Sequence, residues 1–306
     1  MNIQQKKYLV TTFLVLFAVV TTGEEGFRVN KHSSNGVIEH TVFSNGFRNS
    51  LSTDIDNFFC CQDFQGYQVE QLDGGPDLHR DAYGAIVRFN VSDKNIYLVF
   101  TADVNFEGGA HILQVLEKKG IKGSFFFTGN FLRERSNYQL IRKIKKAGHY
   151  IGVHSDQHLL YCDWTNRDSL LITKDEFEAD ILNNFKELKR FGIVSGKSTY
   201  YIPSYEWYNK TIVEWALQLN METINFTPGT GTNADYTTPD MPNYKSSVKI
   251  YSDLLKFERD SEHGLNGAVL LIHPGTSIER KDKFYRYLED LVRHFSSKGY
   301  QFKSLK

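Results

Sequence analysis

The chain is poor in cysteine, carries no excess charge of either sign and has no apolar run long enough to span a membrane. Its 306 residues include three cysteines, too few for the disulfide framework of a small secreted scaffold. Lysine and arginine total 36, as do aspartate and glutamate, which argues against a nucleic-acid binder, because such proteins normally have a basic excess. After residue 20 no stretch approaches about 18 apolar residues, so we expect no stable membrane insertion of the rest of the chain.

The composition is otherwise that of a folded globular protein. Apolar residues make up 41% and charged residues 24%, which distinguishes the chain from a disordered one. Aromatic residues reach 14%, and such rings either line a core or stack against sugars. The length allows one large domain or two ordinary ones.

The N-terminus has the pattern of a targeting segment. Lys6 and Lys7 precede a mostly apolar segment over residues 8–20, and small residues followed by Glu24 and Glu25 come next. A short basic region, a short apolar core and a polar start indicate a secretory signal peptide over residues 1–23. An uncleaved membrane anchor is the alternative interpretation. We therefore expect a secreted or periplasmic protein.

The rest of the chain divides near residue 94. Residues 24–93 have no long periodic stretch, and we interpret them as an irregular N-terminal leader of unknown role. From there on, short apolar runs alternate with helical patterns. Strands are predicted at 96–100, 124–127, 150–153, 200–202, 223–226 and 268–272. The predicted helices include one through Ile112 and Leu116 that Gly120 ends, one that ends at Gly148, one that a Thr173–Glu176 capping box begins, and one that ends at Gly299. This α/β pattern over 94–306 predicts a parallel sheet covered by helices, either a barrel or an open doubly wound sheet.

Reactive side chains follow several of these strands. They are Asp103, His154 and His158, Glu206, Asp235, and His273. Because the carboxyl ends of parallel strands meet at one edge of a sheet or one mouth of a barrel, these residues are expected to form a site there.

His154 and His158 are candidate metal ligands. They are four residues apart, so on a helical turn their rings would face the same way. Two imidazoles with the carboxylate of Asp103 suit a divalent ion with open positions for water and substrate. Zn²⁺ fits this donor set best, and Co²⁺ and Ni²⁺ remain open.

At these motifs the chain resembles a known family. Asp103, the HSDQH segment at 154–158, the aromatic and proline residues at 201–207, and Leu271-Ile272-His273 follow the order and approximate spacing of the NodB-homology polysaccharide deacetylases. The chain is similar to a divergent secreted branch of these family 4 carbohydrate esterases, like those of Bacteroidetes. The resemblance implies a distorted (β/α) barrel over residues 94–306.

The resemblance also implies roles for individual residues. Asp103, His154 and His158 match the family's metal ligands, and His273 matches the histidine that protonates the leaving amine. Asp235 stands where many members have an acidic residue that supports this histidine, although it is equally a candidate for capping a turn. The implied reaction is the metal-assisted hydrolysis of an acetyl group on a glycan.

Two departures from the family pattern concern the general base. The family's base is the aspartate before the metal ligand, and here that position is Ala102. The arginine that normally holds this base is also absent, since Tyr201-Ile202 stands in its place. Either another carboxylate acts as base, or the site binds a metal without turnover. Glu206 is the first candidate, and Asp156 and Glu107 are the others.

The sequence thus leaves three hypotheses. The first is a secreted, metal-dependent deacetylase that removes N-acetyl or O-acetyl groups from a polysaccharide or oligosaccharide. The second is a catalytically inactive protein that binds a metal and a carbohydrate, because Ala102 replaces the family's base aspartate. The third is a hydrolase of a different C–N bond. Four rings near the site are interpreted either as a rim that stacks on sugar or as ordinary packing: Trp164, Tyr205, Trp207 and Tyr236.

Overall fold

The computed structural model describes residues 78–193 and 199–306. The predicted signal peptide, the adjacent cysteines Cys60 and Cys61, and most of the predicted leader lie outside these residues. None of the helices in the described ranges is long and apolar enough to cross a membrane.

In the described part of the chain, the strands form a single sheet. They are β1 (His79–Arg80), β2 (Ile86–Arg88), β3 (Asn95–Ala102), β4 (Ser124–Phe127), β5 (Tyr150–Val153), β6 (Thr199–Tyr201), β7 (Met221–Thr223), β8 (Ala268–Ile272) and β9 (Gln301–Lys303). Their order is β1-β2-β8-β3-β4-β5-β6-β7, and β9 pairs with β3. The strands from β3 to β8 pair in parallel, whereas β1 and β2 add an antiparallel edge beside β8.

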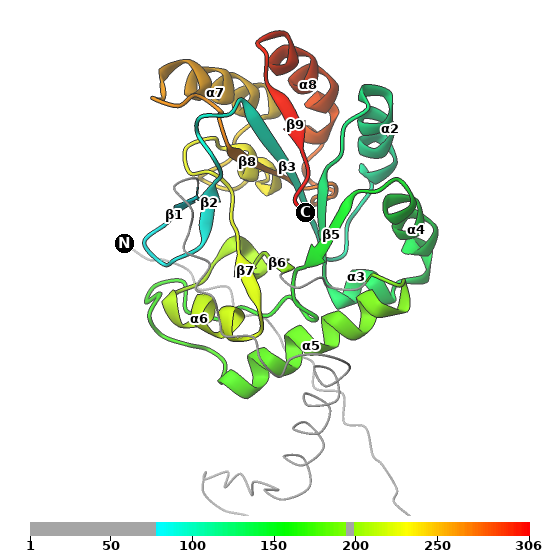
Figure 1. Ribbon diagram of the computed structural model, residues 1–306, viewed down its shortest axis with the longest axis vertical. Helices are drawn as coiled ribbons and strands as arrows, with labels where there is room; N and C mark the ends of the chain where they lie inside the picture. Colours follow the sequence, from blue (N-terminus) through cyan, green and yellow to red (C-terminus); the bar gives the residue numbers. More distant parts are fainter. Residues whose placement is uncertain (1–77, 194–198) are drawn as a thin grey trace, which may run out of the picture. The chain divides into compact units, whose positions relative to one another are not determined.

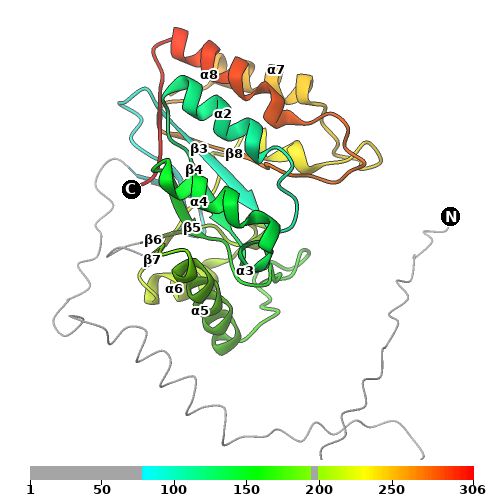
Figure 2. The same cartoon turned by 90° about the vertical axis from the view of Figure 1, so that its right-hand side faces the viewer.

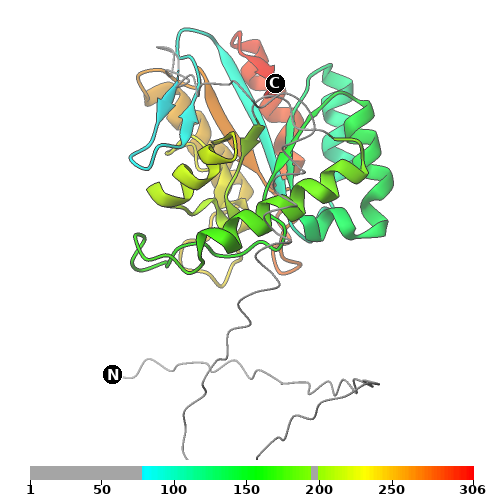
Figure 3. The same cartoon turned by 60° about the horizontal axis from the view of Figure 1, so that its bottom comes forward.

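Helices surround these strands, as Figure 1 shows. The α-helices are α2 (Gly109–Lys119), α3 (Gly129–Arg133), α4 (Tyr138–Lys146), α5 (Lys174–Arg190), α6 (Lys210–Gln218), α7 (Ser247–Asp260) and α8 (Leu288–Ser297). Short 3₁₀ turns lie at η1 (Arg135–Asn137), η2 (Ser204–Glu206), η3 (Thr232–Tyr236) and η4 (Phe284–Tyr287). In Figure 2, α2, α7 and α8 stack at one end of the sheet, and α5 and α6 lie at the other. Figure 3 shows the same ring of helices from a third direction.

The sheet curls until its two ends meet. A parallel bridge joins Ile86 of β2 to Ile224, which directly follows β7, and the amide of Asn225 donates to the carbonyl of Ile86 at 2.9 Å. Because β2 also pairs with β8, this bridge connects the last parallel strand to the opposite edge of the sheet. The result is the predicted distorted (β/α) barrel, so the fold prediction is confirmed.

Alternating residues of each strand divide between two cores. Leu98, Phe100 and Phe125 pack in the layer between the strands and the helices. Val99 and Phe126 belong to a second cluster that contains no residue of an α-helix and fills the interior of the barrel. That interior cluster includes Ile86, Phe89, Val99, Phe126, Ile202, Ile224, Val269, Leu271 and Leu305.

The structure agrees with most of the predicted elements and moves a few. Strands β4, β5 and β8 have the predicted limits, Gly120 ends α2 in the left-handed conformation, and the Thr173–Glu176 capping box begins α5. The strand predicted at 223–226 lies at Met221–Thr223 instead. The sheet also begins before residue 94, since β1 and β2 fall in the predicted leader. Strands of two and three residues are too short to show a period in sequence.

Candidate active site

Strand register brings the predicted site residues to one mouth of the barrel. Ala102 pairs with Phe127, and Phe127 pairs with Val153, so these three strand ends are level. The residues that follow them therefore lie side by side, and Thr128 Oγ1 indeed donates to Asp103 Oδ1 at 2.9 Å. Side chains an even number of residues apart along a strand share a face. Asp103 therefore continues the inward-facing side of Val99, and His273 that of Leu271.

The rings of His154 and His158 meet, but not on a helix. Their centroids are 5.1 Å apart. The segment between them is an irregular turn in which Ser155 (φ 83°) and His158 (φ 55°) are left-handed, so the prediction that a helical turn brings the rings together is wrong. The turn is held instead by Ser155 Oγ, which accepts from the amide of His158 and from Ser204 Oγ, both at 2.9 Å.

Both histidines are held in the neutral form that a metal ligand requires. Burial, reinforced by the neighbouring His158, lowers the pKa of His154 to about 3. Burial also lowers the pKa of His158, against the opposing charge of Asp103. Neutral imidazoles offer a lone pair at pH 7, so this pair is chemically suited to bind a divalent cation.

The donor set fits a metal ion in part. His154 Nδ1 lies 2.8 Å from the carbonyl of Ile202, which fixes Nδ1 as the N–H donor and leaves Nε2 free to coordinate. The Asp103 carboxylate accepts hydrogen bonds from Thr128 and, at 3.3 Å, from Asn130 Nδ2. Within the described ranges, no three His, Cys, Asp or Glu side chains converge closely enough to hold a metal ion in this conformation.

His273 is bound twice by Asp235. Asp235 Oδ1 lies 2.6 Å from His273 Nδ1, and Asp235 Oδ2 accepts from the backbone amide of His273 at 2.9 Å. Burial alone would lower the pKa of His273, but the charges of Asp235 and Glu206 and the hydrogen bond outweigh it and raise the pKa to about 8. The ring is therefore a cation at neutral pH, with its Nε2 proton available for donation.

Glu206 lies at the same mouth with an unengaged carboxyl group. It is half-buried, its pKa is raised by burial, and it interacts electrostatically with both His273 and Asp235. Among the described residues, no hydrogen bond or ion pair reaches its carboxyl oxygens. A carboxyl group with a raised pKa and free lone pairs has the properties of a general base.

The two other candidate bases have partners. Asp156 is buried and paired with Arg133 Nη1 at 2.6 Å, and Gln157 Nε2 donates to its second oxygen at 3.3 Å. Glu107 forms an ion pair with Lys283 Nζ at 2.7 Å and accepts from the amide of Thr276 at 3.2 Å. Glu107 thus anchors the loop after His273.

Asp180 is a supporting residue that the sequence analysis missed. Its carboxylate, on α5, accepts hydrogen bonds from the backbone amides of Asp156 (3.2 Å) and Gln157 (2.9 Å) and from the hydroxyl of Tyr161 (2.6 Å). Its signal in the sequence is a carboxylate on the buried stripe of α5, between Phe177 and Ile181. A carboxylate on an apolar face needs polar partners, and here the partners are the amides between the two histidines.

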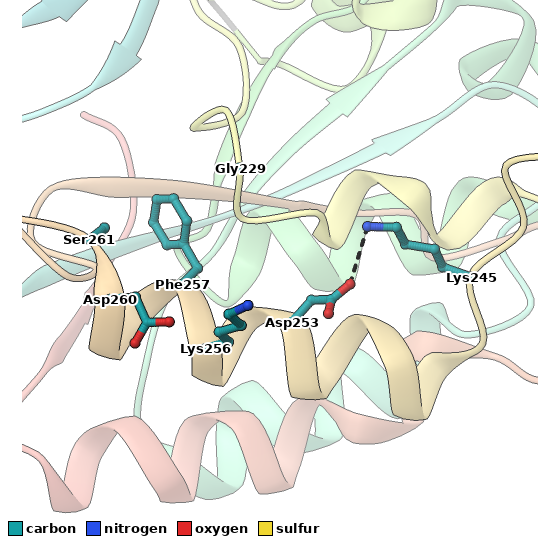
Figure 4. A pocket seen from close by; sticks show the side chains of 7 residues that line it. All are labelled: Gly229, Lys245, Asp253, Lys256, Phe257, Asp260 and Ser261. Atoms are coloured by element: carbon teal, nitrogen blue, oxygen red, sulfur yellow. Dashed lines mark hydrogen bonds and ion pairs between the residues drawn. The ribbon is translucent and has the colours of Figure 1, made fainter.

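A separate surface hollow of about 380 Å³ lies on α7 and the loop after β7 (Figure 4). Its polar feature is the ion pair between Lys245 and Asp253, whose Nζ and Oδ2 atoms are 3.2 Å apart. None of the predicted site residues lines it, so it is not part of the candidate active site.

Part of the chain matches a known protein family. Residues 89–224 match the family model of polysaccharide deacetylase. The peptidoglycan-N-acetylmuramic acid deacetylase PdaA of Bacillus subtilis is 26% identical over 239 residues, which cover 76% of this chain and 79% of PdaA. An uncharacterized 30.6 kDa protein of Geobacillus stearothermophilus is 33% identical over 124 residues, 38% of this chain and 42% of that protein.

Solved structures share the fold. The structure of PdaA has a TM-score of 0.54 at 24% identity and covers 72% of this chain and 83% of its own. A family 4 carbohydrate esterase pseudoenzyme from Bacillus anthracis has a TM-score of 0.56 at 19% identity and covers 74% of this chain and 68% of its own. The family-model match over residues 89–224 identifies a polysaccharide deacetylase domain, of the NodB-homology group of carbohydrate esterase family 4, in this chain.

Proposed function

We propose that this protein is a secreted, metal-dependent deacetylase that hydrolyses N-acetyl (or O-acetyl) groups of a polysaccharide or oligosaccharide. The observation that carries the proposal is the doubly bound His273–Asp235 pair at the same barrel mouth as a neutral histidine pair. The name of PdaA, a deacetylase of an amino sugar in peptidoglycan, supports an acetylated glycan as the substrate class. The basic and apolar pattern of residues 1–23 supports secretion.

The proposed ligands are His154, His158 and Asp103, with Zn²⁺ as the ion best suited to two imidazoles and a carboxylate. His154 is preset for coordination by its Nδ1 contact with Ile202. Asp103 has to exchange its contacts with Thr128 and Asn130 for the ion. A bound Zn²⁺ supplies Lewis acidity, which polarises an acyl carbonyl and lowers the pKa of water.

The protein's own residues then handle two protons. Glu206 removes one proton from the attacking water while the water oxygen bonds to the carbonyl carbon of the acetyl group. His273, a cation at neutral pH, donates its Nε2 proton to the leaving nitrogen as the C–N bond breaks, and acetate and a free amine result. For an ester, the same proton goes to the leaving oxygen. Asp235 stabilises the cationic ring before this transfer.

A second candidate function is carbohydrate and metal binding without turnover. The observation that favours it is Ala102, which is buried at the end of β3 and has no polar side-chain atom. One of the matched structures is described as a pseudoenzyme of carbohydrate esterase family 4. The role of Glu206 distinguishes the two functions, because a deacetylase needs a general base and a binding protein does not.

Metal content and acetate release test the proposal together. We predict that the wild-type protein binds about one Zn²⁺ per chain and that His154→Ala removes most of it, because a ligand locked by Ile202 is lost. Elemental analysis measures the metal, and acetate release from N-acetylchitotetraose measures activity. His79→Ala, a change at an exposed histidine, is the control and should retain both. Undiminished zinc in His154→Ala would contradict the site.

A further inference from the structure

Arg280 is a fully buried arginine on the loop that follows His273. Its side chain has no exposed surface, yet its ion pair with Asp282 is long, with Nη2 and Oδ2 3.9 Å apart. Among the described residues, no acceptor reaches its Nε. Burying so weakly paired a cation costs stability, and an apolar side chain would fill the space at lower cost. The value of the guanidinium at this position therefore lies in its hydrogen bonds.

The hydrogen bonds of Arg280 close the base of the loop at 237–245. Nη1 donates to the carbonyl of Thr237 at 2.7 Å, and Nη2 donates to the carbonyl of Lys245 at 3.0 Å and to Ser247 Oγ at 3.3 Å. Thr237 Oγ1 also accepts from the amide of Lys245 at 3.3 Å. One guanidinium thus binds both ends of this loop and the first residue of α7.

Thr237 lies directly after η3, the turn that carries Asp235. Thr237 Oγ1 donates to the carbonyl of Ala234 at 2.7 Å, so a displacement of Thr237 passes directly to this turn. Asp235 in turn binds the ring and the backbone amide of His273, at the start of the loop on which Arg280 lies. The loop after β8 is therefore bonded to this region at Asp235 and again at Thr237.

The positive charge of Arg280 does not itself favour a cationic His273. The pKa of His273 is raised overall, but burial opposes this rise most strongly, and the charge of Arg280 opposes it further. Any benefit of Arg280 to the His273–Asp235 pair therefore comes from where its hydrogen bonds hold the backbone, and not from its charge.

We propose that Arg280 is a positioning residue that keeps Asp235 in contact with His273 by fixing the base of the loop at 237–245. This inference rests on the proposed function, in which His273 protonates the leaving group. None of the hydrogen bonds in the described ranges joins Arg280 to the Asp235 carboxylate or the His273 ring, so its influence passes through Thr237. Without the guanidinium, the 2.6 Å contact between Asp235 Oδ1 and His273 Nδ1 should lengthen.

Proton NMR of the metal-free protein tests this role without turnover. The Nδ1 proton of His273 lies in a short hydrogen bond to a carboxylate and should resonate far downfield, and its loss in His273→Ala identifies it. Arg280→Met, which removes the donors, should abolish this resonance or move it upfield. Lys281→Met, a change at the adjacent exposed residue, is the matched control and should retain it. An unchanged resonance in Arg280→Met would overturn the inference.

A double-mutant cycle on acetate release separates positioning from general destabilisation. We expect Arg280→Met to lower kcat about 10-fold and to leave KM within about 2-fold, because the proton donor is misaligned while substrate contacts are kept. In protein that already carries Asp235→Ala, Arg280→Met should have little further effect, since the residue through which it acts is gone. An equal loss in both backgrounds would show a merely structural role and overturn the inference.

The outcomes separate this inference from the proposed function. A downfield resonance that depends on Arg280, with no acetate release by the wild type, would support the positioning role and reject the deacetylase. Absence of the resonance from the wild type would overturn the positioning role, because the contact to be held would not exist. If Arg280→Met does not fold, Arg280→Lys decides, since lysine keeps the charge but lacks the fork that binds both carbonyls. It should still shift the resonance, and an unchanged resonance would overturn the inference.

Discussion

Asp235 controls the proton that His273 carries. Its two contacts with His273, to the ring and to the backbone amide, both favour a fixed, cationic imidazole. A general acid must hold its proton before the transfer, so activity should fall as the pH rises through the pKa of His273. The raised pKa of about 8 keeps the acid form in the majority at neutral pH.

We predict that Asp235→Asn lowers the pKa of His273 and moves the alkaline limb of kcat/KM to lower pH. The amide keeps the size of the side chain but removes the charge that raises the pKa. The pH profile of acetate release measures the limb, and NMR titration of the imidazole measures the pKa without turnover. Asp240→Asn, on the same loop and exposed, is the control. An unchanged limb and an unchanged imidazole pKa would reject this role for Asp235.

At this scale the sequence predicts residue types at strand ends, but not their contacts. His154, His158, Asp235 and His273 stand out because each follows a strand. The contacts of Asp156 and Glu107, in contrast, come from Arg133 and Lys283, which lie far from them along the chain or on another element. No local pattern reveals such pairs, so the sequence alone leaves three candidate bases. Of these three, Asp156 and Glu107 have ion-pair partners in the structure, and Glu206 has none among the described residues.

The turn between the two histidines depends on a neighbouring helix. Asp180 of α5 accepts two backbone amides of this turn and the hydroxyl of Tyr161. Asn184 Nδ2, one turn further along α5, donates to the carbonyl of Phe127 at 2.8 Å and ties the same helix to β4. The geometry of the histidine pair thus depends on a helix that carries neither histidine.

We predict that Asp180→Ala lowers zinc affinity about 10- to 100-fold, the range usual for groups that orient metal ligands. It should also destabilise the fold by about 1–3 kcal/mol, because buried donors lose their acceptor. Competition with a chromophoric chelator measures the affinity, and urea unfolding measures the stability. Asp175→Ala, at an exposed position of the same helix, should change neither. Wild-type zinc affinity in Asp180→Ala would show that the turn forms without this support.

Elements were predictable where their own residues carry the pattern. Strands β4, β5 and β8 are short apolar runs between loops, and the capping box of α5 is local. The predicted position of β7 is wrong because Glu222 interrupts the apolar pattern of this strand. Glu222 is tolerated in a buried strand through its ion pair with Arg80 at 2.9 Å. Such a tertiary contact overrides the local preference and is invisible in sequence.

The closed barrel is a property of the whole molecule, and so is its response to pH. His149 is half-buried directly before β5, and its Nδ1 accepts from the amide of Gly123 at 3.1 Å. Burial first, and then the charge of Lys122, lower its pKa from 6.5 to about 4. The unfolded chain therefore takes up this proton at higher pH than the native state does, so the free energy of unfolding declines as the pH falls from 6.5 towards 4.

We predict that His149→Asn flattens this decline by about 1 kcal/mol, a figure reduced from the full linkage value because the ring is partly exposed. Asparagine offers an acceptor oxygen to Gly123 and does not titrate. Urea unfolding at pH 7 and pH 4.5 gives the difference for each protein, with His79→Asn as the exposed control. An equally steep decline in His149→Asn would assign the effect to other groups.

This barrel is proposed to catalyse deacetylation although Ala102 stands where the family has its general base, an aspartate. The most direct measurement is the rate of acetate release from an acetylated oligosaccharide by zinc-loaded wild-type and Glu206→Gln proteins. Our account predicts turnover by the wild type and a loss of about 10²-fold or more in Glu206→Gln, with fold and zinc content retained. A wild-type protein that binds zinc but releases no acetate from any acetylated glycan, or a fully active Glu206→Gln, would contradict it.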